Sequence, residues 1–304
     1  NGNTGTNNGA TDISSGVAVI PSWKIPTALT IPSINYTSSL FIDGSAQDRI
    51  DLNCTISGST ITGDGINLAT TNTIAFWLYN SPTATSPGPI LGGPHSTTSG
   101  NNFGALIYAP GGGSTSGNYG SIDYWLTGQQ AFGASAVAAT QNGQWQHFAF
   151  VRNGSTVTLY IDGQTGSASD YQITLSIPAN ETIVYNIGEG INHGSGSWHA
   201  DAYISNLQLF STNLSATGSE SIESLYNNGQ PKDITGFSNI AAWYTLKDTN
   251  TTSGGGLHDN GSSNFPANNS GASKVDGNVL VPSFNIPVNG VSTTLPSTAL
   301  QQSD

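Results

Sequence analysis

Residues 145–163 read WQHFAFVRNGSTVTLYIDG, and this stretch decides the fold of the chain. Two runs of aromatic and β-branched residues flank Asn153-Gly154, a dipeptide that readily adopts the positive-φ conformations of a two-residue hairpin turn. In the second run the apolar side chains occupy alternate positions, as a half-buried antiparallel strand requires: Val157, Leu159 and Ile161. Asp162-Gly163 then offers a second tight turn. The stretch therefore predicts a β-meander.

The same stretch resembles a known domain family. The residues that carry the likeness to the laminin-G-like, concanavalin A-like lectin/glucanase superfamily include Trp145, His147, Arg152, Tyr160 and Asp162-Gly163. Residues 40–44 and 73–79 resemble the family's opening strands, and residues 203–210 resemble its closing strand, so the resemblance covers about residues 39–229. It implies an all-β fold, an antiparallel jelly-roll sandwich of the concanavalin A-like kind.

The closing strand departs from the family pattern at one place. Where many relatives carry an acidic residue, this chain has Ser205-Asn206. The resemblance therefore implies no inherited metal ligand at that position.

The chain divides into three parts in our interpretation. Residues 1–38 read as a flexible and then Pro-rich extended arm, residues 39–229 as the sandwich, and residues 230–304 as a β-rich tail with a second Pro-rich arm. The arms contain similar octets, VIPSWKIP at 19–26 and LVPSFNIP at 280–287. They are expected to be edge strands or docking arms whose subunit-interface residues are Trp23, Ile25, Phe284 and Ile286. The alternative is a pair of similar linkers.

The strongest helix signal follows the closing strand. Thr217 and Glu220 have capping-box spacing, and Ile222, Leu225 and Tyr226 then fall on one face. A single short helix in a chain of strands and turns agrees with an all-β class.

Aromatic residues within the strand patterns are expected in the core. These are Trp77, Trp125 and Trp145. His147 alternates with Phe148 and Phe150, which predicts a structural, hydrogen-bonded histidine rather than a ligand.

Composition excludes several classes of function. Lys and Arg total 6 against 18 acidic residues, and the formal net charge is −12. Nucleic-acid binding depends on clustered cations, and so does attraction to anionic lipid, so neither is expected. No apolar run approaches the roughly 20 residues that span a bilayer, so no membrane insertion is expected. The absence of methionine predicts a trimmed or processed chain.

Because the family includes glucanases, the positions of the glutamates indicate whether the chain could hydrolyse a glycan. A retaining glycosidase needs two carboxylates about 5–5.5 Å apart, which relatives place on alternate positions of one strand. The chain has four glutamates, and none belongs to such a run: Glu181, Glu189, Glu220 and Glu223. The sequence therefore predicts a protein that is not an enzyme.

The candidate site is the glycine-rich stretch 188–201. A glycan site combines a flat aromatic ring with a few polar groups, and the candidates are Asn192, His193, Trp198 and His199. Carboxylate oxygens suit Ca²⁺, for which the candidates are Glu189 and Asp201. His193 and His199 with Asp201 would instead suit a transition metal. In the remaining interpretation Trp198 caps the core and the rest is a solvated loop.

A second resemblance concerns the context of the module. The ending Leu225-Tyr226-Asn227-Asn228-Gly229, followed by Trp243-Tyr244, is similar to the region after the lectin-like module in structural proteins of marine tailed phages. It implies a virion surface protein, a capsid decoration or fibre component, whose partners are other virion proteins, further copies of itself and cell-surface glycans. The alternatives are a secreted cellular lectin or adhesin and, as a third class, a polysaccharide hydrolase.

Overall fold

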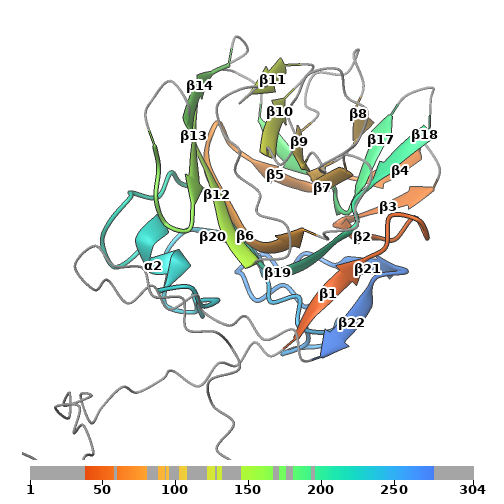
Figure 1. The fold of residues 1–304 in the computed structure, drawn as a ribbon. Helices are drawn as coiled ribbons and strands as arrows, with labels where there is room; N and C mark the ends of the chain where they lie inside the picture. The colour runs from red at the N-terminus through yellow and green to blue at the C-terminus, as the bar shows by residue number, and fades with distance from the viewer. Residues whose placement is uncertain are drawn as a thin grey trace, which may run out of the picture. The chain divides into compact units, whose positions relative to one another are not determined.

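The computed structural model describes residues 38–57, 60–80, 88–92, 94–95, 103–107, 122–126, 129–131, 145–166, 171–175, 181–192 and 196–276. In this part of the chain two large sheets carry most of the strands (Figure 1). The first, sheet A, has the order β14 (Gln172–Thr174), β13 (Thr156–Ile161), β12 (Trp145–Asn153), β6 (Thr71–Asn80), β19 (Ala202–Phe210), β1 (Ser38–Ile42) and β22 (Ser273–Asp276), with β20 (Ile240–Tyr244) paired to β19.

The second large sheet, sheet B, faces sheet A across the core. Its order is β11 (Gln129–Ala131), β10 (Ile122–Leu126), β9 (Phe103–Ile107), β7 (Gly88–Gly92), β16 (Asn186–Ile187), β2 (Arg49–Leu52) and β21 (Ala267–Ser270). Three small sheets complete the list: β15 (Thr182–Val184) with β5 (Ile66–Leu68); β18 (Gly196–His199), β17 (Glu189–Asn192) and β8 (Pro94–His95); and β3 (Cys54–Ser57) with β4 (Thr60–Gly63). Antiparallel pairing within both large sheets confirms the expected all-β jelly-roll sandwich.

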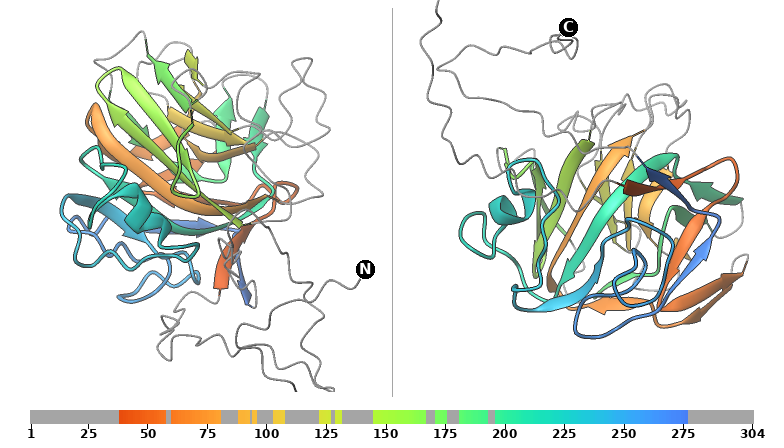
Figure 2. Two further views of the ribbon diagram at one scale, coloured as in Figure 1. Left: turned by 60° about the vertical axis from the view of Figure 1, so that its left-hand side comes forward. Right: turned by 90° about the horizontal axis from the view of Figure 1, so that it is seen from below.

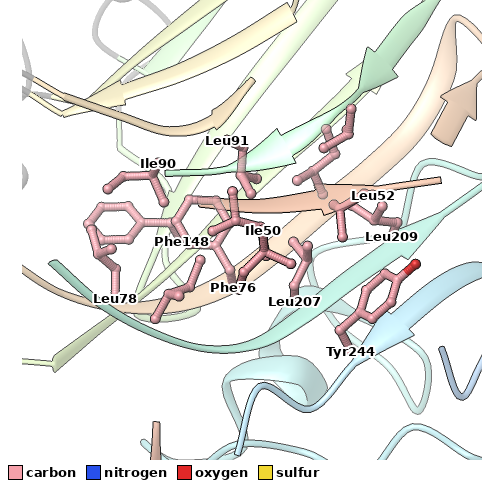
Figure 3. Close-up of a cluster of buried hydrophobic side chains, with 14 of the residues drawn as sticks. Ile50, Leu52, Phe76, Leu78, Ile90, Leu91, Phe148, Leu207, Leu209 and Tyr244 are labelled. Carbon is pink, nitrogen blue, oxygen red and sulfur yellow. The ribbon is translucent and has the colours of Figure 1, made fainter. Parts of the chain in front are cut away.

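The main core lies between the two sheets. Alternate residues of β6 and β12, among them Phe76 and Phe148, point towards Ile50 and Leu91 of sheet B (Figure 3). All four are buried completely. Period-two patterning on two facing sheets is therefore what closes the sandwich.

The predicted meander is confirmed, with one shift. Strands β12 and β13 pair from Phe148–Ile161 to Asn153–Thr156. The two turn residues are thus Gly154, at φ 62°, and Ser155, one position later than the expected Asn153-Gly154. Gly at the first central position provides the positive φ that this hairpin turn needs.

A second, smaller core covers the outer face of sheet A. Helix α2 (Ile222–Tyr226) lies beside sheet A (Figure 2). Its buried residues Ile222 and Leu225 belong to one cluster with Ala75 and Ala149, which is separate from the main core. The described part of the chain contains no helix of the length and hydropathy that a membrane crossing demands.

The cap of helix α2 corrects the sequence interpretation. The N-cap is Ser221, whose hydroxyl accepts the backbone N–H of Ser224 at 3.1 Å. Glu220, expected as the distal half of a capping box, accepts the backbone N–H of Ser238 at 2.9 Å instead. A serine hydroxyl directly before the helix satisfies a free N–H of the first turn, so the distant Thr217 is not needed.

His147 lies in this outer layer and is also a correction. Its ring is fully buried, with its centroid 5.2 Å from that of Trp77, yet neither ring nitrogen has a hydrogen-bond partner among the described residues. The expected hydrogen bonds are therefore missing from the side chain. Trp77 is buried as predicted, Trp145 is partly exposed, and the side chain of Trp125 lies outside the described residues.

Residues 240–276, assigned to the tail in our interpretation, complete both sheets. Strand β20 pairs with β19, β21 with β2, and β22 with β1 (Figure 1). The expected interface residues of the two arms lie outside the described residues: Trp23, Ile25, Phe284 and Ile286.

Candidate functional site

The candidate stretch forms a short hairpin rather than a loop. Strands β17 and β18 pair from Glu189–His199 to Asn192–Gly196, and β17 also pairs in parallel with β8. The hairpin leaves sheet B at Gly188, whose φ is 96°. A Cβ at this position would lie 2.5 Å from Ile42 Cγ2, so glycine is required both by conformation and by space.

At the base of the hairpin Glu189 meets an arginine from β2. Glu189 is 3 % exposed, and its Oε2 lies 3.3 Å from Arg49 Nε. The same Nε donates to Asp51 Oδ1 at 2.8 Å, while Asp51 Oδ2 accepts the backbone N–H of Ile56 at 2.9 Å. One guanidinium therefore bridges two buried carboxylates, which makes the base of the hairpin a charged structural joint.

His199 pairs in register with Glu189 across this joint. Burial lowers the pKa of its imidazole, against the opposing charge of Glu189, so the ring is neutral at pH 7. Within the described residues, neither ring nitrogen of His199 has a hydrogen-bond partner, and neither has Asn186 Nδ2, whereas Glu189 Oε2 has its ion pair with Arg49. These unpartnered polar atoms mark the joint as a place where a water or a polar ligand group would be stabilised.

Asp201 follows the hairpin and is partly exposed. Desolvation raises the pKa of its carboxyl group, and the charge of Asp43 raises it further. Within the described residues, no group of three or more His, Cys, Asp and Glu side chains is placed to hold a metal ion. The roles of Glu189 and Asp201 as Ca²⁺ ligands therefore stay predictions.

The other predicted site residues are only partly placed. Asn192 lies in β17 and Trp198 in β18, but the description does not extend to their side chains, and His193 lies outside the described residues. The structure therefore brings Glu189 and His199 together, and the glycan-binding roles stay predictions.

Sequence reasoning missed Arg49 and Asp51. They belong to β2 and reach Glu189 because β2 pairs with β16, the strand just before the hairpin. Spacing of i and i+2 places two side chains on one face of a strand, so Arg49-x-Asp51 was a readable signal. It becomes informative because the chain has only 6 Lys and Arg residues.

Comparison with known proteins agrees with this architecture. A family model described as the concanavalin A-like lectin/glucanases superfamily matches residues 55–218. No curated protein sequence matches the chain.

Solved structures are similar to the chain at low identity. A candidate carbohydrate binding protein from Bacteroides ovatus superposes with a TM-score of 0.54 and 14% identity over 80% of this chain, which spans 60% of that protein. A native heptameric SAP-like pentraxin from Limulus polyphemus gives a TM-score of 0.49 and 11% identity, covering 81% of this chain and 98% of the pentraxin. A Trypanosoma rangeli sialidase in complex with sialic acid gives a TM-score of 0.39 and 14% identity, covering 62% of this chain and 32% of the sialidase.

Proposed function

The chain belongs to the concanavalin A-like lectin/glucanases superfamily, and from this membership we propose that it is a non-enzymatic carbohydrate-binding module of a virion surface protein. The observation that carries the proposal is a lectin-type sandwich in which no two glutamates share a strand, as the carboxylates of a glucanase would. The Bacteroides ovatus protein of similar fold, a candidate carbohydrate binding protein, supports the same ligand class.

The positions of the glutamates support binding without hydrolysis. Glu181 precedes β15, Glu189 is held by Arg49, Glu220 accepts a backbone N–H of Ser238, and Glu223 is exposed on helix α2. A retaining glycosidase needs two carboxyl groups about 5–5.5 Å apart across one bond. No two of the four glutamates lie at alternate positions of one strand, and the two carboxylates that Arg49 brings together, Asp51 and Glu189, are both buried.

A glycan-array screen of the purified full chain tests carbohydrate binding. We expect glycans to be bound in Ca²⁺ buffer, and a parallel array in EDTA tests the ligand roles of Glu189 and Asp201. Incubation of the bound glycans with the chain should release no new reducing ends. A folded chain that binds no glycan in either buffer, or one that cleaves them, would defeat the proposal.

The virion assignment rests on the phage-like ending after residue 225 and on the repeated octets. A particle component is expected to assemble, so analytical ultracentrifugation of the full chain should show trimers or larger arrays. A monomer at all concentrations, together with absence of the chain from purified particles, would favour the secreted lectin or adhesin.

A further inference from the structure

The segment after β20 contains a hollow of about 440 Å³ beside β21. Its lining combines hydroxyl, imidazole and amide groups with one aromatic residue: Thr251, Ser253, His258, Asn264, Phe265 and Asn268. Phe265 is half-buried against the core, while the hydroxyl and amide residues are exposed. This is the mixture that sugar sites use, an apolar ring surrounded by placed hydrogen-bonding groups.

One wall of the hollow is fixed by Asp259, which is 2 % exposed. Its Oδ1 accepts the backbone N–H groups of Trp243 and Gly261, both at 2.8 Å, and its Oδ2 accepts that of Phe265 at 2.9 Å. The carboxylate thus ties the loop that carries Phe265 to β20. Three N–H donors also compensate its charge.

The segment that contributes Thr251 and Ser253 to the lining is held by Asp248. Its Oδ1 accepts the backbone N–H groups of Asn250 at 2.8 Å and Gly256 at 2.7 Å, and Leu257 N–H donates to the Asn250 carbonyl at 3.0 Å. A Cβ on Gly256 would lie 2.2 Å from the Asp248 carbonyl oxygen, so this close crossing requires glycine. These hydrogen bonds preorganise the irregular loop in one conformation, which lowers the entropic cost of binding a ligand.

The electrostatics of the hollow select the ligand. Among the described residues that line it there is no Lys or Arg, and their one carboxylate, Asp259, has both oxygens occupied by backbone donors. An acidic sugar would find no cation there and would meet a chain of net charge −12. A neutral sugar can be bound by hydrogen bonds to hydroxyl and amide groups and by contact with an aromatic ring, and the lining residues provide all three.

We propose that this hollow is a second carbohydrate site, separate from the β17–β18 hairpin, that binds a neutral mono- or disaccharide unit without a metal ion. The proposal rests on the proposed function, whose ligand class it narrows. It assigns ligand contacts to Asn264 and Phe265.

Two variants test these contacts with the fold preserved. Asn264 is exposed at φ 50°, so Asn264→Gly removes the amide while keeping a backbone conformation that glycine adopts without strain. Phe265→Leu keeps apolar volume but removes the flat ring. The matched control is Asn228→Gly, an exposed asparagine at φ 55° that follows helix α2, outside the lining of the hollow.

The experiment is a neutral and sialylated glycan array, followed by isothermal titration of a bound neutral glycan with each full-chain variant. We expect a neutral glycan to bind equally in Ca²⁺ and EDTA, to bind about tenfold more weakly to Asn264→Gly and to Phe265→Leu, and to bind Asn228→Gly like the parent. Thermal melting verifies that each variant is folded.

Two results would overturn the assignment and are distinguishable. If glycan affinity is unchanged in both variants, the hollow is not the site, while carbohydrate binding by the module stands. If no neutral glycan binds the folded parent in either buffer, the hollow is not a site for neutral sugars. Carbohydrate binding by the module would then stand only if a sialylated glycan binds.

Discussion

Asp162 illustrates how one polar side chain can hold several elements together. Its Oδ1 accepts the backbone N–H of His147 at 2.9 Å, and its own N–H donates to the His147 carbonyl at 2.8 Å, which continues the ladder beyond the last strand pair. Asp162 and Gly163 have φ values of 51° and 77°, the two positive angles of a tight turn. A Cβ on Gly163 would lie 3.0 Å from the Tyr226 ring, so the turn also lets helix α2 approach.

His147, beneath the same turn, predicts a dependence of stability on pH. Burial lowers the pKa of its imidazole from 6.5 to about 3. Between these values the unfolded chain binds a proton that the folded chain does not, so this contribution to stability is complete above pH 6.5 and falls as the pH drops. From pH 7 to pH 5 the loss is about 2 kcal/mol.

Urea unfolding of the parent and of His147→Phe at pH 7 and pH 5 measures this effect. Phenylalanine has a similar shape and no proton to bind, so the free energy of unfolding of the variant should fall less over this interval. Other titrating groups are common to both proteins and cancel in the difference. Equal slopes for the two proteins would contradict a neutral buried imidazole.

Asn206 gives a second prediction at the residue scale. It lies at φ 50° in a bulge of β19, its Oδ1 accepts Trp243 Nε1–H at 2.7 Å, and its Nδ2 donates to the Lys232 carbonyl at 3.1 Å. Asn206→Ala should lower the free energy of unfolding by about 3 kcal/mol, because one buried and one part-buried hydrogen bond are lost and alanine is strained at this φ.

Asn206→Gly separates these two causes. Glycine lacks the same bonds but tolerates the backbone angle, so it should be about 1 kcal/mol more stable than the alanine variant. Chemical denaturation of both variants measures the difference. A fully stable Asn206→Ala variant would show that the Trp243 contact does not hold β20 in place.

At the scale of elements, features that depend on residues close together in the sequence could be predicted. Contacts between strands that are far apart in the sequence could not. The meander and the Asp162-Gly163 turn follow from local periodicity and turn chemistry, so they were predicted within one residue. The helix was found but its cap was not, because Thr217 and Ser221 offer equivalent local signals.

The candidate site was readable only in part for the same reason. Glu189 and His199 were singled out by proximity in the sequence, whereas Arg49 reaches them through pairing of β2 with β16. The hollow near Phe265 was missed because its walls are held by bonds from carboxylates to backbone N–H groups, and composition alone classes such Gly/Ser/Asn stretches as loosely ordered.

The joint between β2 and the hairpin predicts a large effect of removing its cation. Arg49→Met would leave the buried carboxylates of Asp51 and Glu189 without their shared counter-charge. We expect the free energy of unfolding to fall by about 3–5 kcal/mol, with partial recovery on adding Glu189→Gln.

Lys274→Met is the matched control for the loss of a cation from an ion pair. Lys274 and Asp276 are 2.8 Å apart, but their side chains are 43% and 73% exposed, so water already screens the pair. Its removal should cost less than about 1 kcal/mol in the same urea-unfolding measurement. Equal losses for the two variants would contradict a buried joint at Arg49.

At the scale of the whole molecule, the folded unit extends beyond the residues that carry the family resemblance. The family model ends at residue 218, yet β20, β21 and β22 each add to a sheet that begins in the first part of the chain. Tyr244 of β20 is fully buried in the main core, and its hydroxyl donates to the Phe265 carbonyl at 3.0 Å. The later segment therefore supplies core as well as sheet edges.

A truncation series measures this dependence. A chain that ends at Gly229 lacks all three strands, so β1 and β2 become open edges, and apolar core around Leu207 faces water. We expect this chain to lose its cooperative thermal transition and to aggregate, whereas a chain that ends at Asp276 retains every described strand and should melt cooperatively. If the chain ending at Gly229 melts like the longer one, then β20–β22 are an attachment to a sandwich that is already stable, and the hollow beside β21 could be removed without loss of the fold.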